Sequence, residues 1–225
     1  MGSSTLHRVL EPIPDAATGV ARAREILGAL PEWSTAPWVR PRPIATREQF
    51  EHAVAGFPAA QVYGSRDLPA VPLFLDELAR RGAVFDREDP SYRFMIDLRL
   101  GPGLLDLWPL PDGLRMSLGM TSPFGGPDST DEDDSTDAEV DEMVAALGPL
   151  SLEVRWDCKW RGLPHAKMCG LQLCLNGVWG EQCIPEAPGE FGLWVSVGNS
   201  EEIRSVSPLW RETCGLDLGG PQGGW

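Results

Sequence analysis

The spacing of apolar residues changes along this chain, and the change restricts the folds that the chain can adopt. Between residues 16 and 81 apolar side chains recur every three to four positions, as at Phe50, Ala53 and Phe57, which is the period of a helix with one buried face. From residue 94 the period becomes two, because Phe94 and Ile96 alternate with polar neighbours as in a half-buried strand. The pattern predicts an α+β fold with a mostly antiparallel sheet of about six to eight strands and about four helices.

The helix signals are local and specific. Helices are predicted over residues 16–30, 46–57, 67–81 and 136–147, each ended by glycine or proline. Two of them begin with a capping box, in which a threonine hydroxyl and a side chain three residues later satisfy free backbone donors; the pairs are Thr46 with Gln49 and Thr136 with Glu139.

The strand signals predict two hairpins. One spans residues 104–120 and turns at Pro111-Asp112-Gly113, and the other spans residues 168–183 and turns at Asn176-Gly177, the strongest short hairpin signal. Single strands are predicted over residues 152–157 and 193–197. Because residues 67–120 and 137–198 share the order helix then strands, two similar halves sharing a sheet are an alternative.

The predicted domain organisation is simple. One α+β domain covers residues 1–218 and includes a mobile acidic loop over about 122–136. A flexible glycine-rich tail covers residues 219–225.

The negative charge is concentrated in one segment. The 225 residues carry a net charge of −14, and the window from Asp128 to Glu142 holds nine acids and no base. Such a window attracts a basic protein surface and repels phosphates, and the chain has no Lys/Arg cluster, so no nucleic-acid binding is expected.

One tryptophan is predicted to join this surface. Trp194 alternates with Leu193 and Val195 and is therefore expected to face outward, where it can contact a partner. The favoured function is a non-catalytic, intracellular protein-binding module, either a neutralising protein of the immunity or antitoxin kind or an adaptor. The predicted partner-binding residues are Asp128, Asp131, Glu132, Asp133, Asp134, Asp137 and Trp194.

The alternative is an enzyme or small-molecule carrier with a tryptophan-lined pocket near the C-terminal sheet. Its lining residues are Trp160 and Trp179, with Asp157 and His165 as polar groups. The sequence has no Gly-x-Ser-x-Gly elbow and no phosphate-binding glycine loop, so no catalytic residue is assigned and no cofactor is expected.

Metal binding is a third reading, carried by cysteines and one histidine. The candidates are Cys158, His165, Cys169, Cys174 and Cys183. Their successive spacings of seven, four, five and nine residues do not match the close cysteine pairs of structural zinc sites, so buried, reduced thiols are expected instead. No long uncharged apolar segment occurs, and we expect a cytoplasmic protein without membrane spans.

Overall fold

The computed structural model describes residues 4–29, 37–88, 93–118, 135–157, 170–177, 189–198 and 206–222. It confirms the α+β class, with all the strand pairs for which a register is resolved running antiparallel. The strands form two sheets, one of six and one of four strands. The chain divides into two compact units, the first made of residues 1–40, 134–145 and 152–225, and the second of residues 41–133 and 146–151.

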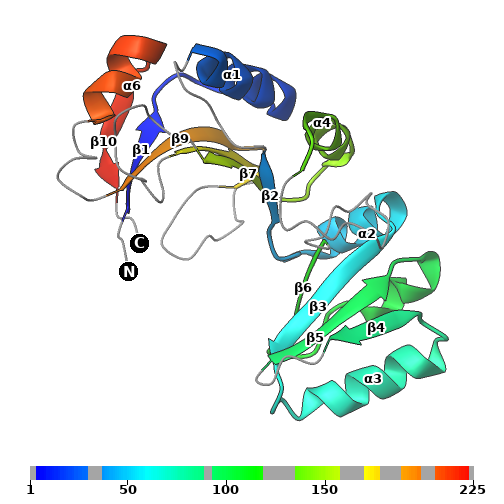
Figure 1. The fold of residues 1–225 in the computed structure, drawn as a ribbon. Coiled ribbons are helices and arrows are strands. Elements are labelled where there is room, and N and C mark those ends of the chain that lie inside the picture. Colours follow the sequence, from blue (N-terminus) through cyan, green and yellow to red (C-terminus); the bar gives the residue numbers. More distant parts are fainter. Residues whose placement is uncertain are drawn as a thin grey trace. The chain divides into compact units, whose positions relative to one another are not determined.

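The first unit is built on the six-stranded sheet, whose strand order is β10-β1-β9-β8-β7-β2 (Figure 1). Its strands are β1 (Ser4–Val9), β2 (Trp38–Pro41), β7 (Leu152–Asp157), β8 (Gly170–Leu175), β9 (Phe191–Gly198) and β10 (Leu218–Gln222). Its helices are α1 (Ala16–Ala29), α4 (Asp137–Ala146) and α6 (Val206–Cys214).

The six-stranded sheet is covered where α1 crosses β8 and β9. All six residues of β8 are buried, as expected for a central strand with both faces covered. A Cβ atom on Gly19 of α1 would lie 2.8 Å from Leu173 Cδ1, so glycine allows the helix backbone to approach the sheet closely. Leu171 and Leu175 lie on the same face of β8 as Leu173, two residues away on either side.

The second unit is built on the four-stranded sheet, with the order β4-β5-β3-β6. Its elements are α2 (Arg47–Gly56), β3 (Ala59–Ser65), α3 (Ala70–Arg80), β4 (Phe85–Glu88), β5 (Arg93–Arg99), the 3-10 helix η1 (Pro102–Leu107) and β6 (Arg115–Leu118). The predicted capping box at the start of α2 is present, with the Gln49 backbone N–H donating to Thr46 Oγ1 at 3.2 Å.

Alternation along the central strand separates a core face from an outer face. Val62 of β3 lies between Ile96 of β5 and Met116 of β6, and all three are fully buried. Gln61, one residue away, is on the outer face and its side-chain amide donates to Asp97 at 3.3 Å. The outer face of this sheet is therefore polar and partly open to solvent.

Three predictions about the fold need correction. The first is the alternative in which two similar halves share a sheet. It is wrong, because the strands form two separate sheets. Residues 102–107 form η1 rather than the first strand of a hairpin, because Pro102 begins a helical turn and the buried Leu104 and Leu107 are three residues apart. The turn itself is confirmed, since Leu114 N–H donates to Pro111 O at 3.0 Å and Gly113 has φ of +84°.

The third correction concerns the C-terminal segment. Residues 218–222, which include the start of the predicted flexible tail, form β10 on the edge beside β1, with Leu6 opposite Gln222. Backbone hydrogen bonding allows glycine-rich residues to extend a sheet without side chains to pack. Residues 223–225 and the loop over 122–134 lie outside the described residues, and the single domain over 1–218 stays a prediction.

Candidate functional site

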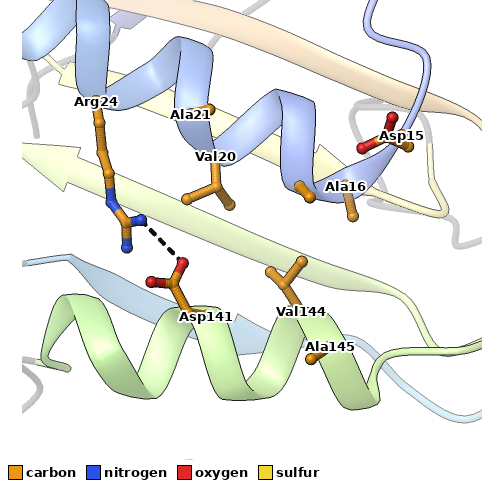
Figure 2. A pocket seen from close by; sticks show the side chains of 9 residues that line it. Asp15, Ala16, Val20, Ala21, Arg24, Asp141, Val144 and Ala145 are labelled. Carbon is orange, nitrogen blue, oxygen red and sulfur yellow. Dashed lines mark hydrogen bonds and ion pairs between the residues drawn. The ribbon is translucent and has the colours of Figure 1, made fainter.

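The first unit contains a surface groove between α1 and α4 (Figure 2). Its volume is about 460 Å³. The residues that line it are Asp15, Ala16, Ala17, Val20, Ala21, Arg24, Asp141, Val144 and Ala145. Alanine and valine side chains form most of the wall, so the groove offers a shallow apolar surface with charged groups at its ends.

Asp15 supplies the negative charge at one end. This residue precedes α1 and caps it: its Oδ1 accepts from the Thr18 backbone N–H at 2.8 Å, and its Oδ2 accepts from the Thr18 hydroxyl at 2.9 Å. The backbone hydrogen bond, followed by the hydroxyl, lowers the pKa of Asp15 below its usual value of 3.8. The carboxylate is thus held in its charged form at the groove.

Arg24 and two acids of α4 close the other end. Asp137 and Asp141 lie one helical turn apart and so share a face of α4. The Arg24 Nη1 to Asp141 Oδ1 distance is 2.9 Å, the Nε to Asp137 Oδ1 distance is 3.3 Å, and Nη2 donates to the Asp137 carbonyl at 2.9 Å (Figure 2 draws the contact with Asp141). The guanidinium therefore links α1 to α4, and Asp141 is the acid of the two that lines the groove.

The start of α4 is fixed by the second predicted capping box. The Glu139 backbone N–H donates to Thr136 Oγ1 at 3.2 Å, and Glu139 Oε2 accepts from the Thr136 backbone N–H at 2.7 Å. This cap orients the first turn of α4, where Asp137 stands, so the acids near the groove are set by local sequence.

The two helices that form the groove, with the residues next to them, carry an excess of negative charge. Arg22 and Arg24 are the bases on α1. The Arg22 guanidinium lies 2.7 Å from the Glu25 carboxylate and 2.9 Å from the Glu11 carboxylate, and these contacts, chiefly the one with Glu25, raise the pKa of Arg22. Seven acids lie on or next to α1 and α4: Glu11, Asp15, Glu25, Asp137, Glu139, Asp141 and Glu142. Seven carboxylates against two ion-paired guanidiniums leave a field that attracts cations.

The structure places the predicted partner-binding residues unevenly. Asp137 is exposed at the start of α4, as the acidic surface requires. Asp128, Asp131, Glu132, Asp133 and Asp134 lie outside the described residues.

The prediction that Trp194 faces outward is wrong. Its exposed fraction is 3%, and it forms a buried cluster with Leu6 and Cys174. Alternation along β9 placed it opposite Leu193 and Val195, but both faces of this sheet are buried, so the face away from α1 is not a solvent face. The Arg8 guanidinium carbon lies 5.8 Å from the centroid of the Trp194 ring.

Most of the alternative pocket falls outside the described residues, namely Trp160, His165 and Trp179. Asp157 is the last residue of β7 and pairs with Gly170 of β8; its side chain is not described. Gln172 of β8 also lies in this part of the sheet; it is 3% exposed, and its side-chain carbonyl oxygen Oε1 has no hydrogen-bond partner among the residues that the structure describes. A buried carbonyl without a donor is uncommon in folded proteins.

The metal candidates are also largely outside the described residues, namely Cys158, His165, Cys169 and Cys183. Cys174 is buried against Leu6 and Trp194, in the manner expected of an apolar-like cysteine. Within the described ranges no group of three or more His, Cys, Asp or Glu is placed to hold a metal ion. Those same ranges contain no helix with the length and apolar character of a membrane span.

Sequence reasoning missed the contribution of α1 to the acidic surface. One feature of the sequence could have indicated it. Asp137 and Asp141 are four residues apart, so their carboxylates lie on one face of the helix, where a cationic side chain from another element can pair with both. Nothing in the sequence identified Arg24 as that cation, because it lies 113 residues from Asp137. Comparison of the chain with protein-family models, curated proteins and solved structures finds no match.

Proposed function

We propose that this chain is a non-catalytic protein-binding module that holds a basic segment of a partner protein against the groove between α1 and α4. The observation that carries the proposal is the apolar groove that has Asp15 at one end and the Arg24–Asp141 ion pair at the other, between helices that carry or adjoin seven acids and only two, ion-paired, arginines. A partner helix or loop with small apolar residues flanked by Lys or Arg complements both features.

The acidic window is next to α4 in the sequence and extends the run of negative charge on that helix. Five acids between residues 128 and 134 precede α4 directly, so the window and the helix carry one continuous run of negative charge. Such a run increases the rate of encounter with a basic protein and makes binding sensitive to salt. The proposal covers two roles, a neutralising protein that binds a basic toxin and an adaptor that binds another basic protein. Both roles require the same acidic surface.

The test compares two pairs of charge-neutralising substitutions in the purified chain. The groove variant is Asp141→Asn with Glu142→Gln on α4. The matched control is Glu48→Gln with Glu51→Gln on α2, which removes the same charge from exposed positions in the second unit. In each pair one acid is ion-paired in the structure, Asp141 with Arg24 and Glu51 with Arg47.

The binding partner is first captured from native lysate at low salt and identified, and affinities are then measured by calorimetry at two salt concentrations. Exposed ion pairs contribute up to about 1 kcal/mol each, so the groove variant should bind roughly tenfold more weakly and with a smaller salt dependence. The control should change affinity less than about twofold. Equal weakening of binding in both variants would mean that affinity depends on the net charge of the chain rather than on the groove. Unchanged affinity in the groove variant would refute the proposed surface.

A further inference from the structure

The second unit contains a pocket of the opposite electrostatic character. It has a volume of about 430 Å³ and lies at the end of the four-stranded sheet where β3 finishes and β5 and β6 begin. Its lining residues are Tyr63, Gly64, Ser65, Arg93, Gly113 and Arg115. Each of these is neutral or basic, in a chain with a net charge of −14.

The strand register places the polar groups of this pocket on one face of the sheet. Arg93 of β5 is directly opposite Ser65 of β3, and Arg115 of β6 is directly opposite Tyr63. Opposed residues project from the same face, and Tyr63 and Ser65 share that face because they are two residues apart. Two guanidiniums and two hydroxyls therefore converge on the outer side of β3.

Glycines allow the backbone to close this end of the sheet. A Cβ atom on Gly64 would lie 2.9 Å from the Gly113 carbonyl oxygen, so only glycine permits the turn at residues 111–114 to pack against β3. Gly113 has φ of +84°, a conformation that side chains disfavour. Because β6 starts immediately after this turn, the close approach is what sets Arg115 beside Tyr63.

We propose that this pocket binds a small phosphate- or carboxylate-bearing molecule. The planar guanidinium forms paired hydrogen bonds with the oxygens of these groups, and the hydroxyls of Tyr63 and Ser65 supply further donors. The site lies in the second unit and takes an anion, so it is independent of the proposed cationic partner of the first unit.

The test is an NMR titration of the full chain with inorganic phosphate, phenyl phosphate and acetate, each at constant ionic strength. Backbone amide signals of Gly64, Ser65 and Gly113 report on the pocket. Saturable shifts of these signals are expected, with a dissociation constant on the order of 1 mM for a single anionic group. Saturation by the phosphates alone, or by acetate as well, distinguishes a phosphate ligand from a carboxylate ligand.

Substitutions decide whether the pocket arginines are responsible. Arg115→Gln should weaken binding by roughly tenfold or more, the effect of losing a charge-assisted hydrogen bond. The control is Arg99→Gln, which removes an exposed arginine from the same face of β5 at the opposite end of that strand, where Arg99 pairs with Ala59. Both positions are exposed, and retained thermal unfolding midpoints would verify folding.

Two results would overturn the proposal. One is the absence of saturable shifts with any of the three probes in the wild-type chain. The other is equal weakening by the Arg115 and Arg99 substitutions, which would mean that the anions respond to overall charge rather than to the pocket.

Discussion

Replacing Trp194 with alanine tests whether this ring belongs to the core or to a binding surface. Its exposed fraction is 3%, and it lies between β8 and β1 in contact with the side chains of Leu6 and Cys174. Burial of a tryptophan side chain removes about 150–250 Å² from water, which at about 25 cal/mol per Å² corresponds to roughly 4–6 kcal/mol. Measured costs of replacing large buried aromatic residues with alanine are about 3–5 kcal/mol.

The two ranges overlap, so Trp194→Ala should lower the free energy of unfolding by about 4 kcal/mol. Loss of the contact with the exposed Arg8 adds about 0.5–1 kcal/mol. Trp194→Phe keeps an aromatic ring beneath Arg8 and should cost considerably less. These decreases are large for a domain whose total stability is typically about 5–15 kcal/mol.

The assay is urea unfolding followed by far-UV circular dichroism, because tryptophan fluorescence itself changes when a tryptophan is removed. Leu73→Ala is the control, since Leu73 is 72% exposed and its loss should change stability by no more than about 0.5 kcal/mol. If Trp194→Ala also costs less than about 1 kcal/mol, the ring is not buried and the reasoning fails. Trp194 would then return to the set of partner-binding residues.

Two further predictions concern a carboxylate with a lowered pKa, Asp15, and a buried side-chain carbonyl, that of Gln172. The pKa of Asp15 is lowered in the folded chain, chiefly by the Thr18 backbone N–H, so its charge stabilises the fold above the unfolded-state value of 3.8 and this contribution is lost as the pH falls through the folded-state value. Asp15→Asn should therefore lower the urea midpoint at pH 7, and the difference from wild type should disappear in acid; a difference that persists there would contradict the role of the charge. Gln172→Met should raise the free energy of unfolding by about 1 kcal/mol, because it removes a buried carbonyl without a donor, whereas Gln61→Met, which removes a hydrogen-bonded amide, should not. A loss of stability in Gln172→Met, measured by urea unfolding, would contradict the assignment of an unsatisfied carbonyl.

The helices were predictable because their signals are local. The Thr46–Gln49 and Thr136–Glu139 boxes define helix starts within four residues, and both are present in the structure. The strand over residues 94–100 was predictable for the same reason, since its alternation reflects one buried face. The error at residues 102–107 arose because Leu104 and Leu107 fit either a strand or a 3-10 turn when no neighbouring element is known.

The candidate sites depended on contacts that the sequence does not display. Acids at the start of α4 were identified from their density, but Arg24 and Asp15 join them only because α1 packs beside α4. Arg93 and Arg115 lie on different strands, and both line one pocket only because of the register of β5 and β6 on β3.

The sequence by itself determined the α+β class, the helices α1 to α4, the strands β5 to β9 and the acidic segment, because caps, turns and periodicity act over fewer than ten residues. It did not indicate β1 to β4, β10 or α6. Only the tertiary structure decided that the strands form two sheets, that Trp194 is buried and that residues 218–222 extend the first sheet beside β1. Strand pairing joins residues as far apart as Leu6 and Gln222. Burial depends on which elements cover a face, and neither property is encoded in the local pattern of a single strand.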